Sequence, residues 1–210
     1  MVDFNKMLGE KLKNKETDPL EIFKRLDKSS GKEYLRPHQE LILSKWHKKH
    51  SDKKDTIVKM HTGQGKTLVG LLMLQSCINA GHGPAIYLCP NNYLVNQIRE
   101  EAKSFGISTV EFEGSGTPPP LEFKNSEAIL IANCHKLFNG KSTFGVSRTE
   151  RDQVKIGSIV MDDAHRCLDI IKNTFSIKII RKKNGVENPV YQKFLNLFES
   201  SLTNQGVGTC

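Results

Sequence analysis

The segment from His61 to Thr67 reads His-Thr-Gly-Gln-Gly-Lys-Thr and separates two apolar runs of different kinds. The run before it, 56–60, is short and contains Ile, Val and Met, which favours a β-strand. The run after it, 66–78, is long, apolar and free of proline, which predicts a helix. Gly63 and Gly65 lack side chains, so another group can approach the backbone between these two elements closely. The sequence therefore predicts a strand, a glycine-rich turn and a helix in immediate succession.

Strand-like and helix-like segments continue to alternate after this turn. Apolar or alternating runs predict strands at 85–89, 108–112, 128–132 and 156–161, with a helix at 93–104 between the first two. Residues 128–132 are almost entirely apolar, as expected for a strand buried on both faces. The alternation predicts an α/β fold with a mainly parallel β-sheet and helices on both faces.

The two ends of the chain are less regular. Thr17-Asp18-Pro19 is typical of a helix start, so residues 1–33 are expected to form a short helical extension. Near the other end, 174–180 alternates like a strand, and 183–185 reads as a hairpin turn. Asn188-Pro189 then begins a further predicted helix. The last residues resemble the interior of a loop, and we interpret the chain as an incomplete domain or fragment.

The composition favours a soluble intracellular protein. Of 210 residues, 37% are hydrophobic and 26% are charged, and the longest apolar stretch, 68–74, is too short to span a bilayer. The first twelve residues contain no apolar signal region. Five scattered cysteines, none in a Cys-x-x-Cys pair, favour a reducing compartment, so we expect a cytoplasmic location and no membrane partner.

Positive charge is concentrated in the first part of the chain. The net charge is +8, and residues 1–60 supply +5 of it from 15 basic and 10 acidic side chains. Such a surface is compatible with a polyanionic partner, although a solvated helix end gives the same pattern. His47 and His50 lie in this stretch without a third metal ligand nearby, so we interpret them as surface residues.

The glycine-rich turn has the parts that a phosphate site requires. Backbone N–H groups at a helix start can point at phosphate oxygens, and glycines admit them. Lys66 can neutralise the β and γ phosphates, and the Thr67 hydroxyl can bind Mg²⁺. The full pattern would have glycine at position 60, where this chain has Met60. A lysine beside a helix cap is the alternative. The expected nucleotide-binding residues of the turn are Thr62, Gly63, Gln64, Gly65, Lys66 and Thr67.

Two adjacent carboxylates follow the apolar run 156–161. In phosphate-loop enzymes an aspartate at a strand end holds Mg²⁺, and a neighbouring carboxylate orients the attacking water. Asp162 fits the metal role and Asp163 the water role. A strand-end turn in which an aspartate caps the next helix is the alternative. With Lys66, these two residues form the expected catalytic set.

The turn and Asp162-Asp163-Ala164-His165 together resemble the first RecA-like domain of superfamily 2 helicases of the DEAD/DEAH-box kind. The resemblance implies a RecA-like fold, ATP and Mg²⁺ as cofactors, and nucleic acid as a partner. The family commonly has glutamate where this chain has Asp163, and the shorter side chain reaches a water less well. Tyr34 to Gln39 resembles the family's upstream glutamine motif, which implies that Gln39 reads adenine.

A further stretch, Pro90 to Gln97, resembles the family motif Pro-Thr-Arg-Glu-Leu-x-x-Gln, which touches the nucleic-acid backbone. Proline, leucine and the last glutamine match, and three central residues differ. The resemblance implies nucleic-acid contacts at Pro90, Asn91, Asn92 and Gln97. The resemblance also implies that His165 couples the ATP site to a second domain, and capping of a turn is the alternative. Trp46 is expected in the core, and Cys89 and Cys134 are expected to be buried structural thiols.

Other family features are missing from the chain. No Ser-Ala-Thr follows residues 162–165, and no second RecA-like lobe with an arginine finger is present. We divide the chain into an extension at 1–33 and a RecA-like ATP-binding domain at 34–210, with the motifs between 34 and 168. The expected function is ATP-driven unwinding or remodelling of DNA or RNA by this domain joined to a second lobe, with little turnover by the chain alone. The alternatives are a non-catalytic nucleic-acid-binding or assembly module with a degenerate nucleotide site, and an ATPase that acts on protein.

Overall fold

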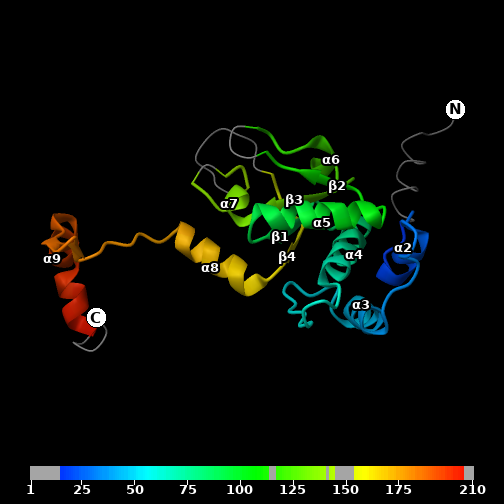
Figure 1. Ribbon diagram of the computed structural model, residues 1–210, viewed down its shortest axis with the longest axis horizontal. Coiled ribbons are helices and arrows are strands. Elements are labelled where there is room, and N and C mark those ends of the chain that lie inside the picture. The colour runs from blue at the N-terminus through cyan, green and yellow to red at the C-terminus, as the bar shows by residue number, and fades with distance from the viewer. Residues whose placement is uncertain (1–14, 114–116, 141, 145–153, 206–210) are drawn as a thin grey trace. The chain divides into compact units, whose positions relative to one another are not determined.

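The computed structural model describes residues 15–113, 117–140, 142–144 and 154–205 (Figure 1). The chain divides into two compact units, Met1–Thr174 and Phe175–Cys210. In the first unit, four strands form a parallel sheet in the order β2-β3-β1-β4. These strands are β1 (Ala85–Cys89), β2 (Thr109–Glu111), β3 (Ile129–Asn133) and β4 (Ser158–Met161).

Helices cover this sheet on both faces. The first unit contains α2 (Pro19–Arg25), α3 (Pro37–Lys49), α4 (Lys66–Asn79), α5 (Asn92–Ser104), α6 (Leu121–Lys124), α7 (Cys134–Leu137) and α8 (Ala164–Thr174). Successive side chains of a strand point to opposite faces. Tyr87 and Ile131 accordingly pack into a core with α2 to α5, whereas Leu88 and Leu130 pack into a second core with Phe123. The predicted α/β fold with a parallel sheet between helices is confirmed.

Most predicted elements of the sheet unit are present within a residue or two. All five residues of β1 and of β3 are buried, as their apolar composition predicts. Helix α4 begins at Lys66 as expected, and Asp18 caps α2 by accepting a hydrogen bond from the Leu20 amide at 2.9 Å. The predicted core role of Trp46 is also confirmed, since its side chain is buried in the core with α2 and α4.

The strand predicted at 56–60 is wrong. These residues have no regular secondary structure, and the side chain of Ile57 is 96% exposed. A strand exists only where a neighbouring strand pairs with its N–H and C=O groups. Within the described residues, β1 is the sole strand that pairs with β4, and none pairs with 56–60. The β propensity of this short segment is therefore not expressed.

The strand predicted at 174–180 is wrong as well. Helix α8 ends at Thr174, whose hydroxyl donates a hydrogen bond to the carbonyl of Ile170 at 2.9 Å. Residues 175–180 pair with no described strand. The apolar residues of α8 follow a strongly amphipathic helical pattern, and this helix includes Thr174, the first residue of the predicted strand. This segment therefore does not supply an additional strand to the sheet.

The second unit consists of a short hairpin and a helix. Strands β5 (Lys182–Lys183) and β6 (Val186–Glu187) pair antiparallel around Asn184 and Gly185, whose φ angles are 53° and 82°. Positive φ at both central residues is the geometry that two-residue hairpin turns require, so the predicted turn is confirmed. The predicted helix is α9 (Pro189–Gln205), and the Asn188 side chain accepts a hydrogen bond from the Val190 amide at 3.0 Å.

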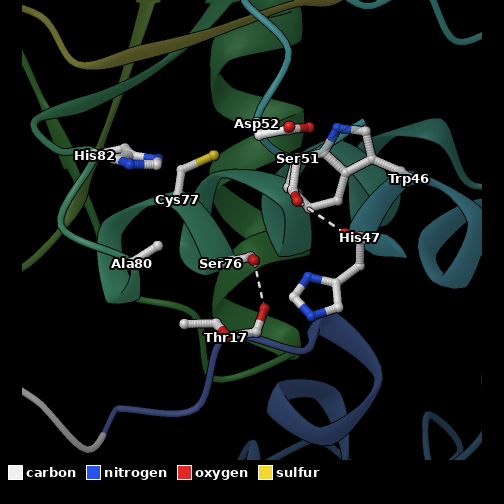
Figure 2. A pocket seen from close by; sticks show the side chains of 9 residues that line it. All are labelled: Thr17, Trp46, His47, Ser51, Asp52, Ser76, Cys77, Ala80 and His82. Atoms are coloured by element: carbon white, nitrogen blue, oxygen red, sulfur yellow. Dashed lines mark hydrogen bonds between the residues drawn. The ribbon is translucent and has the colours of Figure 1, made fainter. Parts of the chain in front are cut away.

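A small cavity of about 200 Å³ lies where the segment before α2 packs on α3 and α4 (Figure 2). The Ser76 hydroxyl donates to the carbonyl of Thr17, and the Asn79 amide donates to the carbonyl of Glu16 at 2.6 Å. The lining comes from Thr17, from the last turns of α3 and α4 and from the residues that follow them, at the opposite end of α4 from Lys66. We assign this cavity to the packing of the N-terminal segment. No helix in the described part of the chain is long and apolar enough to cross a membrane.

Candidate nucleotide-binding site

The turn before α4 has the backbone conformation that its glycines permit. Gly63 and Gly65 have φ angles of 80° and 71°, in the left-handed region that residues with a Cβ rarely adopt. Gly65 is the residue immediately before α4, so its conformation starts the helix at Lys66. Within the turn, the amide of His61 donates to the Gln64 side chain at 3.0 Å, which closes the loop upon itself. Thr62 is exposed beside it.

Side chains from the start of α3 contact the carbonyl groups of this turn. Arg36 donates from Nη1 to the carbonyl of Gly63 at 2.6 Å, and His38 Nε2 lies 2.9 Å from the carbonyl of Gln64. Gln39 donates from Nε2 to the carbonyls of Gln64 and Gly65, at 3.2 Å each. Gln39 is only 4% exposed. The structure thus brings Gln39 and the glycine-rich turn together, through the turn's carbonyl groups.

Asp162 lies directly after β4, at the carboxyl edge of the sheet. Its amide donates to the carbonyl of Leu88 at 2.9 Å, which extends the pairing of β4 with β1 by one residue. Burial raises the pKa of the Asp162 carboxyl above its ordinary value, and the nearby Lys66 ammonium acts in the opposite direction. The two predicted residues are therefore close enough for their charges to interact, although 96 positions separate them in the sequence.

Thr67 contacts a residue that the sequence analysis did not select. Tyr87 on β1 is 1% exposed, and burial raises the pKa of its phenol well above the ordinary value. The Asp162 charge adds to this rise in pKa, while a hydrogen bond with the Thr67 side chain lowers the pKa. Tyr87 therefore interacts with both predicted metal ligands. An aromatic residue in a buried strand gives no sequence signal that distinguishes this position from an ordinary core position.

Asp163 has a structural role in this conformation. Its φ angle is 47°, and its carboxylate accepts a hydrogen bond from the Arg166 amide at 3.4 Å. Its carbonyl also accepts from the Cys167 amide at 3.0 Å, so Asp163 caps α8. The side chain remains exposed at the surface. His165 is exposed too, and its Nε2 lies 3.8 Å from the Asp169 carboxylate one turn later.

The donor set fits a magnesium nucleotide. Mg²⁺ prefers oxygen ligands and retains several waters, so a hydroxyl and one carboxylate beside phosphate oxygens are sufficient protein ligands. Thr67 could supply the hydroxyl and Asp162 the carboxylate, while Lys66 and the start of α4 could supply positive charge for phosphates. No cluster of three or more His, Cys, Asp or Glu side chains suited to a metal occurs among the described residues. Any metal here would thus depend on phosphate oxygens for further ligands.

The predicted nucleic-acid residues lie at the same edge of the sheet, after β1. Pro90 is buried, whereas Asn91, Asn92 and Gln97 are exposed. Asn91 caps α5 by accepting from the Leu94 amide at 3.0 Å. Asn92 accepts a hydrogen bond from Asn133 Nδ2 at 2.5 Å.

Asn133 is the residue at the end of β3, and it was not predicted as a site residue. Its side chain also accepts a hydrogen bond from the Lys136 amide at 2.9 Å, so it caps α7 while holding Asn92. The register pairs Asn133 with Cys89, directly before the Pro90 motif. A polar residue at the end of a buried strand is the signal that could have identified it, because ligands of open α/β sheets bind at the carboxyl ends of strands.

Comparison with known proteins gives one family. A family model described as type III restriction enzyme, res subunit (ResIII), matches residues 32–197. The match includes every predicted site residue, from Gln39 to Asp163. No curated protein and no solved structure matches the chain significantly.

Proposed function

The chain belongs to the family of the type III restriction enzyme res subunit, a family of superfamily 2 helicase ATP-binding domains, and on this premise we propose that it is the ATP-binding lobe of a nucleic-acid helicase or translocase. The lobe would bind ATP with Mg²⁺ and hydrolyse it when joined to a second RecA-like lobe. The complete enzyme would use this hydrolysis to unwind or remodel DNA or RNA. The proposed domain division is 1–33 for the extension and 34–210 for the lobe.

One observation carries the proposal: Lys66, at the first position of α4, lies close enough to Asp162, at the end of β4, for their charges to interact. Phosphoryl transfer depends on positioning and on neutralising charge, which a lysine and a metal-holding carboxylate at one edge supply together. Thr67 adjoins Lys66 in the same first turn of α4. Three residues from two separate sequence motifs therefore lie near one another, which supports a joint role in this chemistry.

Each residue has a defined task in the proposed mechanism. The Gly65 and Lys66 amides and the Lys66 ammonium would bind the phosphates, and Thr67 with Asp162 would hold Mg²⁺. Bound Mg²⁺ would neutralise charge on the phosphate oxygens. Asp163 would orient the attacking water, and the catalytic residues would thus be Lys66, Asp162 and Asp163. Remaining nucleotide contacts would come from Thr62, Gly63, Gln64 and Gln39.

Calorimetric titration with Mg-ADP and Mg-ATP tests the nucleotide site. We expect saturable binding by the wild-type chain and loss of binding in Lys66→Ala, because the exposed Lys66 contributes charge to the site and little to the core. Circular dichroism establishes that both proteins are folded. Absence of binding by the folded wild type would contradict an ATP site in this chain.

Binding of single-stranded DNA and RNA oligonucleotides tests the proposed interaction with nucleic acid. Helicase function predicts affinity that falls steeply with salt, since lysines and arginines that contact phosphates release counterions. The contacts would lie at Pro90, Asn91, Asn92 and Gln97, near the carboxyl end of β1. Nucleotide binding without any oligonucleotide binding would instead favour an ATPase that acts on protein.

A non-catalytic module is the second candidate, and the geometry of Asp163 favours it. The carboxylate of Asp163 accepts from the Arg166 amide, so orienting a water would compete with capping α8. ATP hydrolysis measured with a separately supplied second lobe distinguishes the two candidates. Hydrolysis that disappears in Asp163→Asn supports the enzyme, whereas nucleotide binding without hydrolysis supports the module.

A further inference from the structure

Three neighbouring side chains at the start of α3 contact three successive carbonyl groups of the glycine-rich turn. Arg36 reaches the carbonyl of Gly63 at 2.6 Å, and His38 reaches that of Gln64 at 2.9 Å. Gln39 donates to the carbonyls of Gln64 and Gly65 at 3.2 Å each. Every one of these contacts joins segments that are 25 to 27 residues apart. Side chains at the start of α3 therefore hold the turn through the backbone carbonyl groups of the turn, not through the turn's side chains.

Holding carbonyl groups also orients amide groups. In a planar trans peptide, the C=O of one residue and the N–H of the next point in opposite directions. The carbonyls of Gln64 and Gly65 point at α3, so the amides of Gly65 and Lys66 point away from α3. These are the amides at the start of α4, where the helix dipole favours an anion.

Gln39 is fully engaged in this arrangement. Its Oε1 accepts from the Arg36 amide at 2.9 Å, which sets the direction of the side-chain amide, and its Nε2 contacts two carbonyls. A side-chain amide has only two N–H donors, so both are used. Reading adenine through Nε2 would require one of these bonds to be released.

We propose that Arg36, His38 and Gln39 are positioning residues that hold the turn so that the Gly65 and Lys66 amides face the polyphosphate part of a nucleotide, whatever its base. This inference deepens the proposed function and rests on it. It assigns residues Arg36 and His38 a task that no motif suggested, and it gives Gln39 a task besides adenine contact. The consequence is a site whose phosphate affinity depends on α3.

The first test measures the turn without any ligand. Hydrogen–deuterium exchange of the peptide that covers 61–67 is compared among the wild type, Arg36→Met and Gln39→Glu. Arg36→Met removes the guanidinium from an exposed position and leaves the fold intact, and Gln39→Glu removes both donors at similar size. We expect faster exchange of this peptide in both variants. Lys45→Met, an exposed lysine on the same helix, is the matched control and is expected to leave the exchange unchanged.

The second test measures binding of ADP, GDP and pyrophosphate by the same proteins. Positioning of the amides predicts that Arg36→Met and Gln39→Glu weaken all three ligands by a similar factor, about tenfold, because each loses a hydrogen bond that orients the site. Loss of ADP affinity alone would overturn the proposal in favour of adenine reading by Gln39. Unchanged exchange of the 61–67 peptide in Arg36→Met would overturn it as well.

The two tests separate this inference from the proposed function. A wild-type chain that binds none of the three ligands refutes the nucleotide site and, with it, the task assigned to the oriented amides. Faster exchange in the variants would then still show that α3 holds the turn. Equal weakening of the three ligands together with faster exchange supports both the site and the positioning role.

Discussion

A Cβ atom on residue 65 would lie 2.4 Å from Nε2 of Gln39, so any larger residue at this position would displace the Gln39 amide from its two carbonyl partners. Gly63 has a similar positive φ but has nothing within 4 Å of the position of a Cβ. The two positions of the motif therefore require glycine for different reasons. Gly63 is needed for backbone conformation, and Gly65 for conformation and for close packing.

This difference predicts unequal effects of alanine substitution. Gly65→Ala should destabilise the turn by about 1–3 kcal/mol and abolish nucleotide binding, because strain at positive φ is added to a clash with Gln39. Gly63→Ala carries the strain alone and should cost less. Urea unfolding and calorimetry with ADP measure both effects. Equal losses in the two variants would contradict the packing argument.

Asp162→Asn should raise the thermal stability at neutral pH while it removes the effect of Mg²⁺ on nucleotide binding. The folded state raises the pKa of Asp162 above its ordinary 3.8, so the folded protein binds more protons than the unfolded chain between these two values. Stability then falls as the pH rises through this window. Asparagine carries no charge, so it removes the buried carboxylate that causes this loss of stability at higher pH.

Melting temperatures measured from mildly acidic to neutral pH test this prediction. The advantage of Asp162→Asn should be greatest at neutral pH and should shrink as the pH falls towards the pKa of the carboxyl. Asp169→Asn, an exposed carboxylate on α8, is the matched control and should change little. A lower melting temperature for Asp162→Asn at neutral pH would contradict the prediction.

Tyr87→Phe tests the hydrogen bond between Tyr87 and the proposed metal ligand Thr67. The ring of Tyr87 packs so closely on α4 that a Cβ at Gly70 would lie 2.8 Å from it, and phenylalanine preserves this packing. Loss of the hydroxyl should cost about 1 kcal/mol of stability, because its hydrogen bond with Thr67 is buried. We also expect a smaller gain in ADP affinity on adding Mg²⁺, because Thr67 loses the bond that orients its hydroxyl.

Urea unfolding measures the first effect, and calorimetry with Mg²⁺ or with a chelator measures the second. Tyr93→Phe is the control, since Tyr93 is 77% exposed and its hydroxyl can be replaced by water contacts. An unchanged gain from Mg²⁺ in Tyr87→Phe would show that Tyr87 contributes only to packing.

Asn92→Ala should weaken oligonucleotide binding by about twofold to fivefold without changing its salt dependence. The exposed Asn92 amide is uncharged, so it can donate to a phosphate without releasing a counterion. Filter binding at several salt concentrations measures affinity and slope together. Asn125→Ala, at an exposed position after α6, serves as the control. A changed slope would indicate that charged residues had moved.

The buried cysteines should resist alkylation in the folded protein. Cys89 and Cys134 are 0% exposed, as predicted, and burial raises the pKa of the Cys89 thiol to about 12. The thiolate is the reactive form, so both exposure and ionisation oppose the reaction. Peptide mapping after iodoacetamide treatment should find these two sites unmodified until denaturant is added. Modification of folded Cys89 at the unfolded rate would contradict the buried role.

Local patterns predict the elements whose own residues favour them. Burial on both faces makes β1 and β3 continuous apolar runs, and the amphipathic period identifies α5 within a residue. The hairpin turn at Asn184 is predictable for the same reason, because positive φ favours asparagine and glycine. For these elements, the information lies within a few adjacent residues.

Sequence patterns alone predict the succession of α4, β1, α5, β2, β3 and β4, the glycine-rich turn before α4, and Asp162 at a strand end. The folded structure was needed to learn that 56–60 stays unpaired, that Asp163 caps α8, and that Gln39 holds the turn by its carbonyl groups. The physical reason is the range of the interactions. Backbone conformation and amphipathicity depend on near neighbours, whereas strand pairing and side-chain hydrogen bonds depend on partners that only folding brings within reach.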